Sequence, residues 1–232
     1  RIAMFEIGPV YLATEEGNLP EEPLYLAIVL TGPRHLPAWQ GADLAPMDFY
    51  DLKGILAGLF EGLHLGEVRW EPTAHPTFHP GKCARALLGE RQIAVMGELH
   101  PLVANRYEFP ATPVLAAEVN VEAILKEIPD QFAVRPTPAY PPVLEDLAVV
   151  VDEAVPAGRV LETIQAAGGK TVTDIRLFDV YRDEKIGTGK KSLAYSLTYQ
   201  DPKRTLTDDE VSKIRQRILR RLEQDLGARL RG

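Results

Sequence analysis

Residues 145–181, EDLAVVVDEAVPAGRVLETIQAAGGKTVTDIRLFDVY, decide the fold of the carboxyl-terminal third of the chain. Their first seven residues form a β-branched run that predicts a strand. Pro156 suits the first turn of a following helix. Gly168 and Gly169 end that helix, because glycine tolerates a left-handed cap. The stretch therefore predicts a strand, a helix and a second strand.

A second half with the same plan follows. Residues 191–199 (KSLAYSLTY) predict a third strand, and residues 228–231 a short fourth one. Between them, Thr207 and Glu210 have the spacing of a capping box, in which each side chain satisfies a free backbone N–H of the other residue. Apolar residues recur at helical spacing after this box. The order βαββαβ is that of a ferredoxin-like domain.

Four prolines between residues 136 and 142 favour an extended connector and exclude a regular helix. We therefore expect a domain at 1–135, a linker at 136–142 and a second domain at 143–232. The 232 residues suffice for two cores. The net charge of −7 is uneven: it is −8 over residues 1–141 and +1 over the rest. An acidic front half is a poor partner for phosphate.

The front half reads as an antiparallel sheet with helices packed on it, because short strand-like segments outnumber helical ones. The clearest helix spans residues 48–63, with Asp48 as its N-cap. Its leucines, Ile55 and Phe60 predict one wide apolar face. Strands are expected at 2–12, 24–30, 66–71, 83–88, 92–99 and 114–120, and shorter helices at 101–107 and 121–126.

A polar face is expected on the second sheet. In residues 191–199, Leu193 and alternate residues after it can face the helices, which leaves Ser192 on the other side. In residues 171–181 the alternation slips by one, and a β-bulge would turn Asp179 and Tyr181 to the same open side as Ser192. Taken without any resemblance to a known family, these residues are better interpreted as ordinary solvent-facing residues of a twisted sheet.

Several segments resemble the β subunit of bacterial phenylalanyl-tRNA synthetase. EDLAVVV (145–151), LFDVY (177–181), GKKSLAYSLTY (189–199) and PKRTLTDDEV (202–211) resemble its closing ferredoxin-fold anticodon-binding domain. FEIGPVY, DFYDLKGIL and HPTFHPGKCARALL, followed by MGELHP, look like the preceding catalytic-like domain. The fold class that this implies is α+β: a class II synthetase-like antiparallel sheet, then a ferredoxin-like domain. The chain would be a carboxyl-terminal fragment of a longer polypeptide.

The resemblance implies a tRNA-binding site on the open face. Tyr181 would stack on an unstacked anticodon base, and Asp179 and Ser192 would meet a base edge. Its phosphate-holding flank would comprise Lys190, Lys191, Lys203 and Arg204. The partners implied are a catalytic α subunit in an α2β2 assembly and tRNA(Phe). ATP and Mg²⁺ would serve the whole enzyme, with no cofactor and no catalytic residue in this fragment.

Other readings of the sequence are weaker. Two histidines flanked by Pro76 and Pro80 lack the helix that would give their spacing a metal-binding geometry. Cys83 reads as a small core residue, and the run at 186–192 lacks the spacing of a phosphate loop. Lys213, Arg217, Arg220 and Arg221 read as a solvated helix face.

Two alternatives to this prediction remain. The ferredoxin-like domain could instead bind a small metabolite in a regulatory role. The front domain could be an active synthetase core, but residues near Phe5 and Glu6 lack the arginine that such a core uses to hold the α-phosphate of ATP.

No apolar run approaches the roughly 20 residues that span a membrane. One cysteine suits a reducing compartment, so we expect the cytoplasm.

Overall fold

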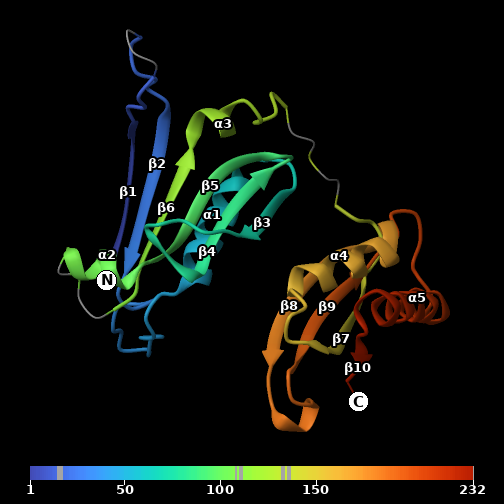
Figure 1. The fold of residues 1–232 in the computed structure, drawn as a ribbon. Helices are drawn as coiled ribbons and strands as arrows, with labels where there is room; N and C mark the ends of the chain where they lie inside the picture. Colours follow the sequence, from blue (N-terminus) through green and yellow to red (C-terminus); the bar gives the residue numbers. More distant parts are fainter. Residues whose placement is uncertain (15–17, 108, 110–111, 132–133, 135–136, 232) are drawn as a thin grey trace. The chain divides into compact units, whose positions relative to one another are not determined.

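The computed structural model describes the chain except residues 15–17, 108, 110–111, 132–133, 135–136 and 232. The chain divides into two compact units, Arg1–Ala133 and Val134–Gly232, here called the front unit and the second unit (Figure 1). Each is an α+β unit with its own sheet and its own apolar core, as predicted. In the part of the chain that the structure describes, no helix combines the length and the apolar character that crossing a membrane requires.

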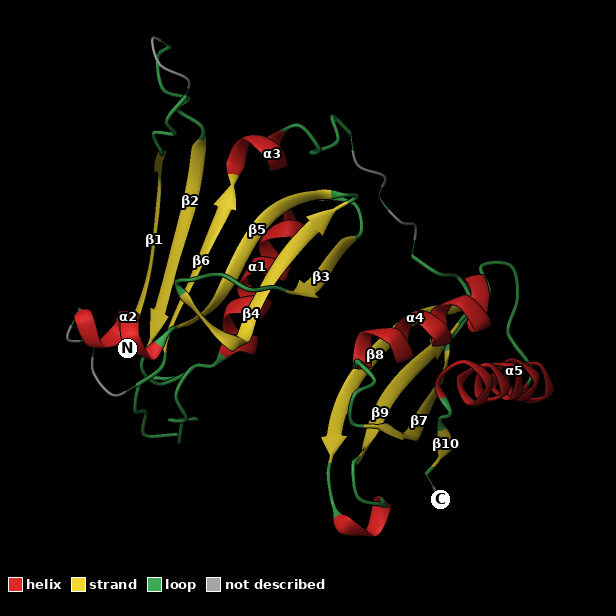
Figure 2. Cartoon of the chain, in the orientation of Figure 1, coloured by secondary structure: helices red, strands yellow, loops and turns green. Residues whose placement is uncertain are grey.

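The front unit contains a six-stranded sheet in the order β1-β2-β6-β5-β4-β3, and every neighbouring pair is antiparallel (Figure 2). The sequence predicted all six strands. The strands are β1 (Ile2–Pro9), β2 (Leu24–Thr31), β3 (Val68–Pro72), β4 (Phe78–Leu88), β5 (Arg91–Leu99) and β6 (Val114–Asn120). The loop between the strands expected at 66–71 and 83–88, which contains Pro76 and Pro80, is shorter than predicted, because β4 begins at Phe78 and has a register shift before Cys83.

Helix α1 (Phe49–Gly62) packs its buried side chains Leu52, Leu56 and Phe60 on one face of this sheet. Ile55 departs from the predicted apolar face and is 47% exposed. Two short helices, α2 (Pro101–Arg106) and α3 (Val121–Leu125), flank β6 in the chain. The apolar residues of α1 therefore do not all belong to the core: only the side of the helix that contacts the sheet is buried.

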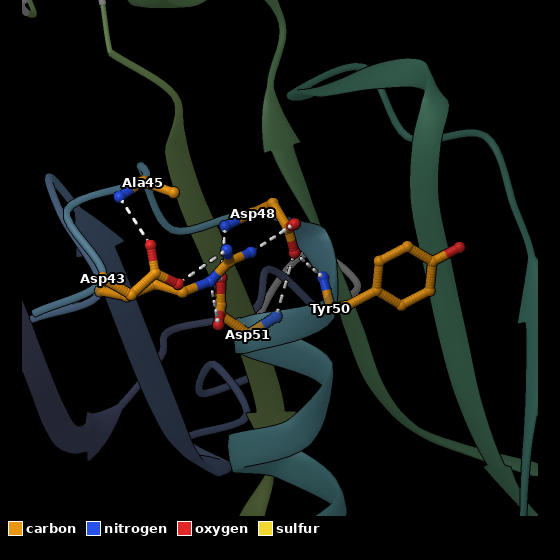
Figure 3. A network of polar contacts seen from close by, with 6 residues as sticks. Asp43, Ala45, Asp48, Tyr50 and Asp51 are labelled. Atoms are coloured by element: carbon orange, nitrogen blue, oxygen red, sulfur yellow. Dashed lines mark hydrogen bonds and ion pairs between the residues drawn. The ribbon is translucent and has the colours of Figure 1, made fainter. Parts of the chain in front are cut away.

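A loop before α1 is fixed by one arginine shared among three carboxylates. The Arg34 guanidinium lies 2.7 Å from Asp48, 2.9 Å from Asp51 and 3.5 Å from Asp43. Asp48 and Asp51 also form a capping box at the start of α1. Figure 3 shows the three aspartates converging at the first turn of the helix. The network ties the loop to the helix that covers the sheet, and it raises the pKa of Arg34 through its hydrogen bond to Asp51.

The second unit is a four-stranded antiparallel sheet in the order β10-β7-β9-β8, with both long helices on one side of it (Figure 1). Its elements run β7 (Val143–Asp152), α4 (Ala157–Gly168), β8 (Val172–Tyr181), β9 (Lys190–Tyr199), α5 (Asp208–Leu226) and β10 (Arg229–Leu230). Side chains from all of these elements except the terminal strand pack one core. This is the predicted ferredoxin-like βαββαβ order. We call the sheet surface opposite α4 and α5 the open face.

Both ends of α5 follow the sequence signals. Thr207 and Glu210 form the predicted capping box, and Gly227 ends the helix in the left-handed region at φ 61°. After this cap the chain turns back, and β10 pairs with β7, placing Arg229 opposite Val150. The carboxyl-terminal residues are thereby carried to the edge of the open face.

Candidate nucleic-acid interface

The predicted β-bulge is confirmed and builds the open face. The register between β8 and β9 shifts between Leu177 and Asp179, which leaves Phe178 unpaired. Beyond the shift, Asp179 lies opposite Ala194 and Tyr181 opposite Ser192. Because the Ala194 side chain is small, it leaves space above the sheet beside Asp179. A flat group could therefore lie there against an exposed carboxylate and an aromatic ring.

Tyr181 is 36% exposed and is held in place from two sides. Its hydroxyl hydrogen-bonds to the Asp183 carboxylate, which raises the pKa of Tyr181. The Lys185 backbone N–H, and then the Tyr181 hydroxyl, lower the pKa of Asp183. The guanidinium of Arg231 lies 4.7 Å from the ring centroid, a cation–π geometry. The ring is thus oriented before any ligand arrives, and Arg231 covers part of it.

Arg231 is a component of this surface that the sequence analysis did not select. Its backbone N–H donates to the Ala148 carbonyl at 2.9 Å, which extends the pairing of β10 by one residue. Its Nη1 approaches the Ser192 hydroxyl at 3.5 Å. The sequence predicted a strand at 228–231 that contains Arg231. It did not indicate on which face of the sheet the Arg231 side chain would lie.

Ser192 needs a correction. It lies on the open side of β9 as predicted, opposite both Val150 and Tyr181, but it is only 1% exposed. Neighbouring side chains and the approaching Arg231 cover its hydroxyl. In this conformation Ser192 cannot reach a base edge; Arg231 would have to move first.

Lys191 also needs a correction. It lies opposite Val151, a residue of the helix-side core, so its side chain leaves the sheet on the side away from Tyr181. It is 9% exposed, and its Nζ donates to the Glu153 carbonyl at 2.7 Å. Successive residues of a strand point to opposite faces, so Lys191 cannot share the face of Ser192. It supports the end of β7 and does not flank the open face.

The remaining predicted cations differ in whether they are already paired with a carboxylate. Lys190 pairs with Asp152 at 2.6 Å, on the edge of the open face. Arg204 is held by both carboxylate oxygens of Glu210, at 2.6 and 2.8 Å. Lys203 is exposed, and its side chain makes no hydrogen bond or ion pair with the described residues. Of these three, Lys203 is the cation most available to a phosphate.

Two further exposed side chains belong to the same surface by register. Arg176 lies opposite Ser196 on β9, in line with Asp179 and Tyr181 along β8. Arg229 lies opposite Val150 on the other side of β7. Together with Arg231 they add cations to a face that also carries Asp174 and Asp179. The face is therefore mixed in charge, which suits reading of bases combined with a few phosphate contacts.

In the described part of the front unit, the cysteine and histidines that the sequence raised as candidates for chemistry are buried or already hydrogen-bonded. Cys83 is buried, as predicted, and burial raises the pKa of its thiol. Phe78 covers the sheet face opposite α1 at Gly97, where an added Cβ would lie 2.8 Å from the Phe78 ring. The Nδ1 atoms of His75, His79 and His100 each accept a backbone N–H. Within the described ranges, no group of three His, Cys, Asp or Glu residues could hold a metal ion.

Named proteins match this chain over its whole length. A β subunit of phenylalanine–tRNA ligase from Geobacillus kaustophilus is 43% identical over all of the chain and 28% of the relative. The corresponding subunit of Symbiobacterium thermophilum is 39% identical over 99% of the chain and 25% of the relative. The chain thus spans about a quarter of the length of these relatives. A solved pyrrolysyl-tRNA synthetase from Desulfitobacterium hafniense is 16% identical, over 53% of this chain and 40% of that one, with a TM-score of 0.39.

Two family models divide the chain between them. Residues 138–231 match the model described as a ferredoxin-fold anticodon binding domain, which contains every element of the open face. Residues 1–121 match the model of the phenylalanyl-tRNA synthetase β chain CLM domain. This second match covers more than half of the 232 residues. The chain therefore belongs to the phenylalanyl-tRNA synthetase β chain family.

Proposed function

We propose that this chain is a non-catalytic part of a phenylalanine–tRNA ligase. In this proposal the second unit binds the anticodon stem-loop of tRNA(Phe) through its open face. The front unit scaffolds the catalytic α subunit in an α2β2 assembly, which works in the cytoplasm. The observation that carries the proposal is the placement of Asp179 and Tyr181 on one exposed face beside the small residue Ala194.

Stacking and edge reading divide between these two residues. Tyr181 has an oriented, partly exposed ring, and a base stacked on an aromatic ring gains affinity that does not depend on sequence. Asp179 is exposed and can accept two hydrogen bonds, from the N1–H and the N2 amino group of a guanine. Phenylalanine anticodons begin with G, so Asp179 would supply the specificity and Tyr181 most of the affinity.

A cycle of two changes tests the role of Asp179. Wild-type and Asp179→Asn enzymes, assembled with the α subunit, are titrated with tRNA(Phe) carrying guanosine or inosine at the first anticodon position. Inosine lacks the N2 amino group. We expect inosine in place of guanosine to weaken tRNA binding by the wild-type enzyme several-fold. It should have little effect on the Asp179→Asn enzyme, because the inosine and the Asp179→Asn substitution remove the same contact. Equal effects on both proteins would overturn the assignment of Asp179.

The catalytic chemistry is assigned elsewhere in the enzyme. ATP and Mg²⁺ would be used by the whole assembly, but this chain does not fit an ATP site. Strand β1 carries no arginine, and over β4 and β5 the cluster of Phe78, Cys83 and Val95 covers the sheet face opposite α1. Formation of phenylalanyl-adenylate by this chain alone would contradict this part of the proposal.

The scaffolding role rests on family membership and on the exposed apolar side chains of β1, among them Met4 and Phe5. Co-expression of the β subunit with its α subunit tests it. We expect the two to co-purify, and Phe5→Glu to reduce the fraction recovered together. Glu223→Gln, on α5 of the second unit, is the control. Unchanged co-purification of Phe5→Glu would remove β1 from the interface.

A further inference from the structure

A groove on the second unit lies between α4 and α5, outside the surface described so far. It has a volume of about 940 Å³, and four arginines line it: Arg159 from α4, and Arg217, Arg220 and Arg221 from α5. Two acids, Glu162 and Asp225, lie in the same lining. The side chains that line the groove therefore carry a net charge of +2.

The groove exists because α4 presents small side chains to it. On the α4 side, Thr163, Ala166, Ala167 and Gly169 follow Arg159 and Glu162 in the lining, whereas mostly long side chains line the α5 side. A chain-like ligand can therefore approach the α4 backbone while arginines reach it from α5. An apolar anchor has little to fill, since alanine methyl groups are the main apolar surface offered.

The arginines differ in how far they are already engaged. Arg217 donates to the Ala167 carbonyl at 2.6 Å and to the Gly168 carbonyl at 3.3 Å, at the end of α4. Arg159 and Arg221 pair with one carboxylate each, Glu162 and Asp225. The Arg220 side chain makes no hydrogen bond or ion pair with the described residues. One guanidinium is thus free, and two others are held by exposed pairs that contribute little stability.

The arrangement on α5 costs helix stability unless an anion relieves it. Lys213, Arg217 and Arg221 follow one another at i,i+4 spacing, and Arg217 and Arg220 at i,i+3. Like charges at these spacings repel on a helix surface. Asp225 relieves only Arg221. A polyanion in the groove would relieve the repulsion among Arg217, Arg220 and Arg221, which line it.

We infer that this groove binds the phosphodiester backbone of an RNA segment. Guanidinium groups match phosphate oxygens with two parallel hydrogen bonds, and this favours phosphate over a diffuse negative surface. An acidic peptide would need apolar anchors that the alanine side of the groove does not provide. The groove is open to solvent and not an enclosed cavity, so it fits a run of backbone better than a single nucleotide.

The segment bound here differs from the one on the open face. α4 and α5 cover the other side of the sheet (Figure 2), and most of the residues that line the groove lie outside the core between these helices and the sheet. A helix is about 10 Å across and packs on top of the sheet, so an unpaired loop lying on the open face cannot also enter the groove. The inference holds whether or not the open face reads an anticodon.

The test measures binding of a labelled 12-nucleotide oligouridylate to the 232-residue chain over a series of salt concentrations. The variant Arg220→Gln/Arg221→Gln removes two groove cations and leaves Arg217, which supports the end of α4. Its control, Arg106→Gln/Lys126→Gln, removes the same charge from exposed positions of the front unit. A second variant, Ala166→Glu, keeps every arginine and places a carboxylate in the groove. Thermal melts verify that all variants fold.

We expect the groove variant to bind several-fold more weakly at low salt, with a log–log salt slope shallower by about 1.4, because each phosphate contact with a single strand contributes about 0.7. Ala166→Glu should weaken binding as well, and the front-unit control should not. Wild-type slopes in both groove variants would overturn the inference. Equal affinity for a polyglutamate of the same charge would also overturn it, by showing a site for any anion. Tyr181→Ala probes the open face and should leave the groove contribution unchanged.

Discussion

The Arg231 guanidinium lies over the Tyr181 ring, 4.7 Å from its centroid, while the Tyr181 hydroxyl bonds to Asp183. The two contacts act on the Tyr181 pKa in opposite directions. Asp183 is the largest cause of its rise, and the positive charge of Arg231 lowers it. A carboxylate that accepts a hydrogen bond from the phenolic O–H stabilises the neutral form, and a nearby cation stabilises the phenolate.

Two substitutions should therefore move the Tyr181 pKa in opposite directions. Asp183→Asn removes the acceptor charge and should lower it toward 10, the ordinary value for tyrosine. Arg231→Gln removes the cation and should raise it further. Titration of the Tyr181 Cζ resonance by NMR measures both. Shifts of the same sign would show that the ring does not lie between these groups.

Two buried tyrosines on β9 form a matched pair. The Tyr195 hydroxyl donates to the Ala157 carbonyl at 2.8 Å, whereas the Tyr199 hydroxyl has no hydrogen-bond partner among the described residues. Tyr195→Phe should lower the free energy of unfolding by about 0.5–1.5 kcal/mol. Tyr199→Phe should leave it unchanged or raise it, because a buried polar group without a partner is removed. Denaturant unfolding compares them, and equal losses would contradict the contact pattern.

Two glycines of α4 provide a second matched pair. A Cβ at Gly168 would lie 2.9 Å from the Val172 Cβ and would collide with its Cγ2, whereas nothing lies within 4 Å of a Cβ at Gly158. Gly168→Ala should destabilise the second unit by about 1–3 kcal/mol through overpacking. Gly158→Ala should stabilise it by about 0.5–1 kcal/mol, because alanine favours the helix. A stabilising Gly168→Ala would mean that α4 and β8 are packed less closely than described.

The capping box of α5 gives a dependence on pH. Hydrogen bonds from Arg204, and then from the Thr207 backbone, lower the pKa of Glu210 to about 2, from an ordinary value of 4.5. The folded state thus favours the ionised form. Its contribution to stability is complete above pH 4.5 and is lost as the pH falls toward 2. Glu210→Gln should flatten the fall of the melting temperature over this range. Glu223→Gln, on the same helix, controls for the loss of one charge; equal flattening by both would contradict the role of Glu210.

Much of the fold could be predicted because local signals agree with one another. The capping box at Thr207, the glycines after α4 and the alternation in β9 each point to one ferredoxin-like order. The slip of alternation after Leu177 predicted the β-bulge, since a single extra residue reverses the faces of all that follow. Boundaries were less certain: β4 begins at Phe78 because the strand bends through Pro80, which a local pattern does not encode.

The site was predicted less completely, for physical reasons visible at three residues. Lys191 was grouped with Ser192 by nearness in sequence, although adjacent strand residues face opposite sides. Ser192 lies on the expected face, but its burial depends on Arg231, which is 39 residues away along the chain. The position of Arg231 depends in turn on the pairing of a two-residue edge strand. Such contacts are set by tertiary structure and carry no local pattern.

Retention of tRNA(Phe) by the assembled enzyme at fixed salt, compared among wild type, Tyr181→Phe and Tyr181→Ala, tests the central claim most directly. Tyr181→Phe keeps the ring and should bind close to wild type. Tyr181→Ala removes the ring and should weaken binding about 5- to 150-fold, the range for loss of one base–aromatic stack. Tyr50→Ala, an exposed aromatic residue of the front unit, is the control and should have no effect. Wild-type retention by Tyr181→Ala would contradict the assignment of the open face to the anticodon.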